Sequence, residues 1–170
     1  MKKTNKKGFT LVELLAVIVI LGVLLMIAVP AIQNVIRNSR KKSFESAAKL
    51  ALENVETMAS AERTDNTLTE CYISIDSIEL ERGSFGKNAV GVIIVDSLGK
   101  GKIGMYNDEY VVSDGELGTK NDGTSGVQAT VKQANSSIKI DTYAITYSNE
   151  NYSVKKGNAD VPICTWYTAK

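Results

Sequence analysis

Few side chains in this 170-residue chain could do chemistry. Histidine is absent, which removes the commonest general base and the commonest zinc ligand. The two cysteines, Cys71 and Cys164, are too few to hold a structural zinc ion by themselves. The sequence also has no nucleophile elbow, no metal-spaced cluster and no glycine-rich phosphate loop. We therefore expect no catalytic residue, no metal site and no cofactor, in a protein that is not an enzyme.

Glu13 is the one charged residue in an apolar stretch that runs from residue 9 to residue 29, FTLVELLAVIVILGVLLMIAV. About 20 apolar residues in a helix span the hydrocarbon core of a bilayer, so this stretch is long enough to cross a membrane. A carboxylate inside such a span costs about 3 kcal/mol and usually has a partner and a role. The alternative is a glutamate near the membrane interface that reaches water or is protonated.

A conventional secretory signal is the first alternative for this N-terminus. It would combine the lysines ahead of the stretch with a cut after small residues, near Val29, Pro30 and Ala31. Two features argue against it: Glu13 lies near the start of the stretch, and the helical pattern continues past Ala31. The stretch is also too long for the apolar core of an ordinary signal peptide.

The segment KKGFTLVELL, at residues 6–15, resembles the cleavage and methylation segment of type IV prepilins. It has a short basic leader, Gly8, Phe9, a Thr-Leu pair and an acid five residues after the glycine, and apolar sequence follows. Pro30 also fits the pattern of that family. The resemblance covers residues 1–31, less than a fifth of the chain, and beyond it only the layout is similar.

This resemblance implies that a prepilin peptidase removes a leader peptide, residues 1–8, on the cytoplasmic side of the membrane. The cut would fall between Gly8 and Phe9, and the new amine of Phe9 would be methylated. A glycine suits this position because its backbone can enter an enzyme cleft in an extended form. Lysines 2, 3, 6 and 7 favour a cytoplasmic N-terminus, but Arg37, Arg40, Lys41 and Lys42 flank the other side, so the resemblance decides the orientation.

The resemblance also implies a role in assembly for Glu13. Its carboxylate would pair with the Phe9 amine of a neighbouring subunit, which is cationic near neutral pH. Each charge would be costly alone in an apolar filament core, and the two together are tolerable. The pair would therefore set the axial register of the subunits.

A single long helix is predicted from about Thr10 to about Glu62. Residues 9–30 form its transmembrane and assembly part, and residues 31–62 form an amphipathic part that continues into a head domain. Pro30 removes one backbone hydrogen bond, so we expect a kink there. The opposite face of the amphipathic part carries charges that include Glu45, Lys49 and Glu56. Its apolar residues recur at steps of three and four: Ile32, Val35, Ile36, Phe44, Ala47, Ala48, Ala51, Leu52, Val55, Met58 and Ala59.

Residues 63–170 are predicted to form an antiparallel β head domain. Short β-like runs alternate with turns, and residues 113–126 read as a polar surface loop. A helix followed by strands indicates an α+β fold in which the sheet packs on the upper part of the helix, and the pilin family has this arrangement. The candidate strands are Cys71–Ile75, Val90–Val95, Lys102–Met105, Glu109–Val112, Ser137–Tyr147 and Tyr152–Val154.

Cys71 and Cys164 are expected to form a disulfide. A membrane span that exports the head places both thiols in a compartment where disulfides can form. The bridge would tie the start of the head to its last segment and stabilise it by on the order of 4 kcal/mol in the chain-entropy model. The alternative, a reactive cysteine, lacks a histidine and a nearby basic motif.

The predicted function is that of a structural subunit, major or minor, of a type IV pilus filament that supports adhesion, motility or surface interaction. The alternative is a pseudopilin of a type II secretion machine or a competence DNA-uptake machine, since pseudopilins share the N-terminal motif. An enzyme or receptor tethered by one span is the weakest reading, because the chain has no catalytic constellation.

The expected partners are other copies of the chain and other pilins, the prepilin peptidase, the assembly platform and a motor ATPase. The precursor is expected in the cytoplasmic membrane with a single pass, and the assembled filament at the cell surface. Nucleic acid is not an expected partner. The chain carries 20 Lys and Arg against 19 Asp and Glu, and without the four lysines of the leader it carries 16 against 19.

Overall fold

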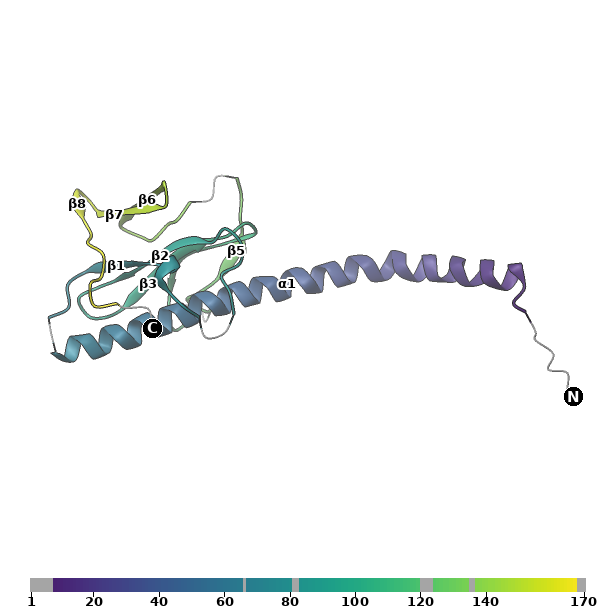
Figure 1. The fold of residues 1–170 in the computed structure, drawn as a ribbon, viewed down its shortest axis with the longest axis horizontal. Coiled ribbons are helices and arrows are strands. Elements are labelled where there is room, and N and C mark those ends of the chain that lie inside the picture. The colour runs from purple at the N-terminus through teal and green to yellow at the C-terminus, as the bar shows by residue number, and fades with distance from the viewer. Residues whose placement is uncertain (1–7, 66, 81–82, 120–123, 135–136, 168–170) are drawn as a thin grey trace, which may run out of the picture. The chain divides into compact units, whose positions relative to one another are not determined.

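A computed structural model describes residues 8–65, 67–80, 83–119, 124–134 and 137–167. The chain divides into two compact units, residues 1–39 and residues 40–170. One helix, α1 (Leu11–Asp65), contributes to both units, and in the described residues of the second unit eight strands follow it. Figure 1 shows their arrangement. The predicted α+β class, a long N-terminal apolar helix followed by antiparallel sheets, is confirmed.

The helix α1 has 55 residues and agrees with the predicted helix to within a few residues at each end. Pro30 lies inside it, and the helical assignment is continuous on both sides. A proline at this place removes one backbone hydrogen bond without ending the helix. The kink at Pro30 stays a prediction.

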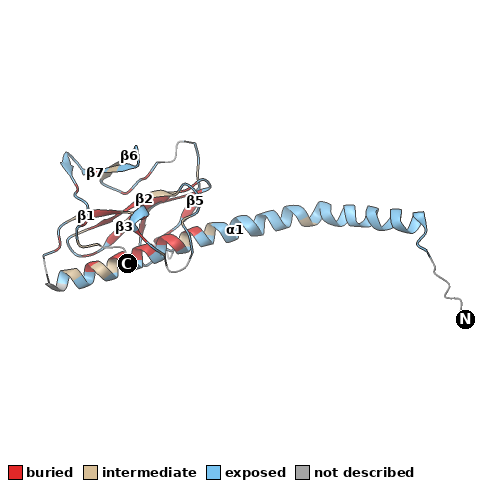
Figure 2. Ribbon diagram, in the orientation of Figure 1, coloured by how far each residue is buried: buried red, intermediate tan, exposed pale blue. Residues whose placement is uncertain are grey.

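In the second unit, one face of α1 is buried against the head (Figure 2). Four of the residues on this face are alanines, so strands can approach the helix backbone closely. A Cβ added to Gly101 would lie 2.6 Å from Leu52 Cδ1, which shows how little space separates strand and helix. The buried residues are those that the spacing predicted: Phe44, Ala47, Ala48, Ala51, Leu52, Val55 and Ala59.

A five-stranded antiparallel sheet packs on this face of α1. Its second strand alternates between two cores: Ile93 and Val95 belong to the cluster with α1, whereas Val92 and Ile94 belong to a second cluster on the other face. A sheet that is buried on both faces explains why this strand, VGVIIV, is apolar throughout. The strands lie in the order β1 (Cys71–Ser74), β2 (Val90–Val95), β3 (Gly101–Tyr106), β4 (Tyr110–Glu116) and β5 (Ala129–Val131).

A separate three-stranded sheet covers the second face, with the order β6 (Tyr143–Ser148), β7 (Asn151–Lys156) and β8 (Ala159–Asp160). A two-residue turn joins β6 to β7, and both of its residues, Asn149 and Glu150, have positive φ, 49° and 62°. Such a turn matches the twist of a tight hairpin. The head therefore has three layers: the upper part of α1, the five-stranded sheet and the three-stranded sheet (Figure 1).

The strand predicted over Ser137–Tyr147 is wrong in its first half. Ile138 and Ile140 are buried in the second cluster, but their segment is irregular, and strand structure begins only at Tyr143. The alternation of apolar and polar residues correctly indicated that one side of this segment is buried. Burial of one side does not require that the segment pair with another strand, so the alternation alone could not establish a strand. The sequence also gave no indication of β5 and β8, which have three residues and two residues. The polar loop begins later than predicted, because β4 continues to Glu116.

Cys71 and Cys164 form the predicted disulfide, with an S–S distance of 2.03 Å and 4.9 Å between the Cα atoms. The backbone beside it also pairs. Tyr72 N–H donates to Pro162 O at 2.9 Å, and Cys164 N–H donates to Tyr72 O at 2.9 Å. The last segment of the chain is thus held to the outer edge of β1 by one covalent bond and two hydrogen bonds.

Candidate processing and assembly site

Thr10 and Glu13 close the N-terminal end of α1. The Oε2 atom of Glu13 accepts hydrogen bonds from the backbone N–H and from the Oγ1 hydroxyl of Thr10, both at 2.8 Å. The Glu13 N–H in turn donates to Thr10 Oγ1 at 3.3 Å. This reciprocal pattern is a capping box, in which two side chains satisfy backbone N–H groups that the first turn of a helix leaves unpaired.

The capping box gives Glu13 a partner within its own chain, which the sequence analysis missed. The signal was present, because a Thr followed three residues later by a Glu, just ahead of an apolar run, is the pattern of a capping box. A carboxylate here also lies at the positive end of the helix dipole. A carboxylate has room for about four acceptor contacts, so the two bonds from Thr10 leave capacity for another donor.

Gly8 and Phe9 precede α1 and have no helical structure. Both are exposed, and Phe9 has 88% of its surface accessible. Apart from its chain neighbours, no described residue lies within 4 Å of the place where a Gly8 side chain would be. The peptide bond between them is therefore open to an enzyme from several directions. The rest of the predicted leader, residues 1–7 with its lysines, lies outside the described residues.

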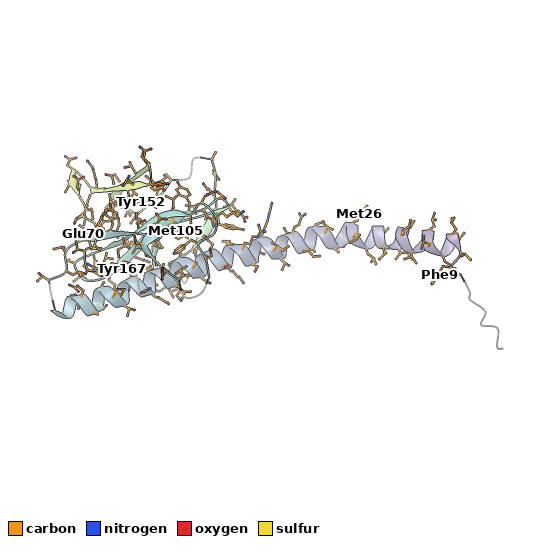
Figure 3. All side chains as sticks on the ribbon, viewed as in Figure 1. Phe9, Met26, Glu70, Met105, Tyr152 and Tyr167 are labelled. Atoms are coloured by element: carbon orange, nitrogen blue, oxygen red, sulfur yellow. A yellow bond between two sulfur atoms is a disulfide. The ribbon has the colours of Figure 1, made fainter. Side chains whose placement is uncertain are left out.

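The N-terminal part of α1, residues 11–36, presents apolar side chains over its whole circumference. Met26 illustrates this, since its side chain stands clear of the helix (Figure 3), and residues 11–27 are all exposed (Figure 2). Among the described residues, α1 is the one helix that is long and apolar enough to cross a membrane. Large apolar side chains are exposed at positions 11, 12, 14, 15, 17–21, 23–27, 29, 32, 35 and 36.

Two acidic residues of the upper part of α1 contact the sheet, which corrects the prediction that they lie on a face opposite to it. Glu45 Oε1 accepts a hydrogen bond from Ala129 N–H at 2.8 Å, and Glu56 Oε1 accepts one from Gly101 N–H at 2.9 Å. These carboxylates lie at the flanks of the apolar face, where they reach backbone donors at the ends of strands. They position the sheet on the helix.

A polar cluster joins the two sheets. Tyr143 Oη donates a hydrogen bond to Glu70 Oε1, and Lys156 Nζ donates to the two oxygens of the same carboxylate at 2.7 Å and 3.1 Å. Burial alone would raise the pKa of Glu70, but the hydrogen bonds from Lys156 and Tyr143 outweigh it and hold the pKa below its usual value. The cluster thus connects β6 and β7 to the residue just ahead of β1.

A second link between the sheets involves Tyr152, on the inner side of β7 (Figure 3). Its Oη accepts a hydrogen bond from Gly91 N–H at 3.0 Å, and its carbonyl oxygen accepts one from Tyr72 Oη at 3.1 Å. Burial raises the pKa of Tyr152 to about 12. Both clusters are internally satisfied, and no group of three or more Cys, Asp or Glu residues in the described part of the chain could hold a metal ion.

Comparison with protein families gives one match. The model described as the prokaryotic N-terminal methylation motif matches residues 3–29, which include Gly8, Phe9 and Glu13. The comparisons with curated proteins and with solved structures gave no match.

Proposed function

We propose that this chain is a type IV pilin-like protein and a structural subunit of a type IV pilus filament. The methylation motif and the long apolar helix support a pilin or a pseudopilin whose precursor is anchored in the membrane. The proposal adds that the mature subunit polymerises into a long filament at the cell surface.

The uncovered apolar surface of α1 carries this proposal. None of the large side chains between residues 11 and 36 is buried within a single chain, so some other apolar phase must cover them. In the precursor that phase is the bilayer. In the filament it would be the same segments of neighbouring subunits, and because lipid is equally apolar, close packing and polar pairing must supply the preference for assembly.

The processing step of the proposal uses the segment ahead of α1. Residues 1–8 would be removed by a prepilin peptidase, and Phe9 would become the methylated N-terminus. The open peptide bond between Gly8 and Phe9 supports this order of events. Residues 9–30 would then be the assembly segment, residues 31–62 the part of the helix that continues into the head, and residues 63–170 the β head.

We assign Glu13 to assembly as well as to the capping box. Its carboxylate lies at the end of α1 where the Phe9 amine would appear after the cut, and it retains capacity for a further donor. The proposed donor is the Phe9 amine of a neighbouring subunit. Because a subunit does not leave a bilayer unaided, an assembly platform and a motor ATPase are further proposed partners.

The mass and the first residue of the mature protein test this proposal. We expect a chain that starts at Phe9 and carries one N-methyl group. The matched variant is Gly8→Leu, whose side chain would obstruct the peptidase and should leave the full-length precursor in the membrane. A mature chain that starts near Ile32 would show ordinary secretion and would overturn the proposal.

Electron microscopy separates the pilus subunit from the pseudopilin. Abundant long filaments that contain this chain, and that disappear when its gene is deleted, support the pilus subunit. A scarce protein whose deletion abolishes protein secretion or DNA uptake, without loss of long filaments, would identify a pseudopilin.

A further inference from the structure

The two sheets of the head have four outer edges in the described part of the chain, and three of them are protected against pairing with another strand. The edge of β1 is occupied by the last segment of the chain, which pairs with Tyr72. The edge strand β5 has three residues and is followed by Lys132, and β8 has two residues and ends at Asp160. Short length and charge are the usual means by which proteins keep an edge strand from pairing.

The fourth edge, β6, has none of these protections. It has six residues, YAITYS, without a charge or a proline, and aromatic or β-branched residues occupy four of its positions. Such residues favour the strand conformation. In the described structure β6 pairs along its length with β7, and on its other edge only Tyr143, its first residue, has a backbone partner, Ile140. It is therefore the one long, uncharged edge that the head offers to another strand.

The hydrogen-bonding pattern between β6 and β7 shows which residues of β6 point their backbone N–H and C=O groups to the open edge. Tyr143 N–H donates to Ile140 O at 3.1 Å, so this residue turns its N–H away from β7. Because residues of an antiparallel pair alternate between facing the partner and facing away, Ile145 and Tyr147 also present their N–H and C=O groups to the open edge. Thr146 lies between them and bonds toward β7, opposite Ser153.

The side chains of the same residues are compatible with a second strand. Ile145 packs against the second core cluster, and the Tyr147 ring lies 4.6 Å from the Tyr152 ring on the inner side of the sheet. Thr146 is exposed on the outer side. A strand added at this edge would extend an apolar row on one face and a small polar row on the other.

We propose that β6 is a self-association edge, on which the β6 strand of a second copy of this chain pairs antiparallel with Thr146 at the two-fold axis. In this register Ile145 of each copy lies opposite Tyr147 of the other copy. The free N–H of each residue donates to the free C=O of the residue opposite. All the open groups of both residues are then satisfied. Ile–Tyr pairs and a central Thr–Thr pair are favourable across neighbouring strands, and the absence of charge removes repulsion between identical strands.

A two-fold contact closes after two copies, so it cannot repeat along a filament whose subunits all point the same way. The β6 edge would instead join the heads of two different filaments. This inference does not depend on the proposed function, because two copies could pair through β6 whatever they assemble into.

Disulfide trapping tests the register. Thr146→Cys in the full-length chain, purified in detergent, should form a covalent dimer under mild oxidation. The two Cα atoms would lie about 4.5 Å apart in a non-hydrogen-bonded pair, within the range of a disulfide.

The matched control is Ala144→Cys, which is exposed on the same face of β6 two residues away. In the proposed register the two copies of residue 144 would be about 13 Å apart along the strand, so we expect on the order of tenfold less dimer. A mixture of Ala144→Cys and Ser148→Cys chains should restore the dimer, because these two positions lie opposite each other. Equal trapping of Thr146→Cys and Ala144→Cys would overturn the proposal.

A charge variant tests the same contact without a new thiol. Thr146→Lys places two ammonium groups directly opposite each other and should abolish dimers in chemical crosslinking of the full-length chain. Ser153→Lys, on the neighbouring strand and the same face, adds the same charge away from the axis and should leave them. Dimers that survive Thr146→Lys, or are lost equally with both variants, would also overturn the proposal.

Discussion

The Glu45 carboxylate accepts a hydrogen bond from the backbone N–H of Ala129 at 2.8 Å, so a side chain of the long helix holds the last strand of the five-stranded sheet. The two residues are 84 positions apart. Ala129 is fully buried, so its N–H is shielded from water and depends on this acceptor. The contact fixes where β5 lies on the helix.

Removal of this acceptor should loosen β5. Glu45→Ala leaves the Ala129 N–H without a partner, which costs about 1–3 kcal/mol for a buried donor. We expect faster amide hydrogen exchange over residues 129–131 in the full-length chain. Glu45→Gln keeps an acceptor and serves as the control, with exchange close to that of the parent. Unchanged protection in Glu45→Ala would show that the hydrogen bond does not hold the strand.

Mutations can separate the proposed assembly role of Glu13 from its role in the capping box, because Thr10 shares the capping box but carries no charge. Glu13→Ala should strongly reduce filament yield while the protein still inserts in the membrane, because the Phe9 amine would lose its proposed partner. Glu13→Gln keeps an acceptor for Thr10 and should fail in the same way. Thr10→Ala weakens the cap, keeps the carboxylate and should still assemble. The yield of sedimented filaments measures all three, and normal yield from Glu13→Ala would refute the assembly role.

The disulfide should dominate the stability of the last segment. Replacement of both Cys71 and Cys164 by serine should lower the free energy of unfolding of the head by on the order of 4 kcal/mol, because the closed loop spans 93 positions. Denaturant titration of the full-length chain in detergent measures the change. The control is alkylation of the parent chain without reductant, which should add no mass; two alkylated thiols would show that the bridge is not formed.

Tyr152 should make the head sensitive to alkaline pH. Its pKa is raised from 10.0 to about 12 in the folded chain by burial. A raised folded pKa contributes stability below the unfolded value of 10.0, and this contribution is lost as the pH rises toward 12. The free energy of unfolding should therefore fall in this window, by less than the ~1.4 kcal/mol per pH unit of a full proton, because Tyr152 is half-buried and solvent screens its charge.

The control for this prediction is Tyr152→Phe. It has no titrating hydroxyl, so the alkaline slope should decrease, although the loss of the bond from Gly91 N–H lowers stability at neutral pH. Burial also raises the pKa of Tyr72, Tyr143 and Tyr167, so part of the slope should remain. An identical slope in parent and variant would contradict the assignment to Tyr152.

The sequence predicted the parts of the fold that depend on long, regular patterns. The buried residues of α1 in the head, from Phe44 to Ala59, could be predicted individually, because an apolar period of 3.6 residues sustained over several turns indicates a helix with one buried face. The strand β2 was predicted with its observed bounds because it is a short run of mostly β-branched residues that Asp96 ends. Cys71 and Cys164 pair as expected, since a chain with two thiols offers one intramolecular bridge.

Short elements and polar contacts could not be predicted in this way. Ile138 and Ile140 alternate with polar residues as a strand would, but their neighbours in space come from other parts of the chain, which a local pattern cannot reveal. Glu45 and Glu56 looked like solvated charges because nothing in the helix identifies the distant backbone N–H groups that they accept. The capping box was different, since Thr10 and Glu13 are close in sequence and the pattern was readable.

The bridge between Cys71 and Cys164 also determines how the head would respond to damage. The polypeptide between these residues includes the connection from β4 to β5, whose sequence is polar and rich in glycine, a composition typical of segments that proteases attack. A single break anywhere within it would yield two fragments that stay linked through sulfur, heavier than the intact chain by one water molecule. Release of the C-terminal piece would then require reduction of the disulfide, so a nicked chain would keep its two fragments in one covalent unit.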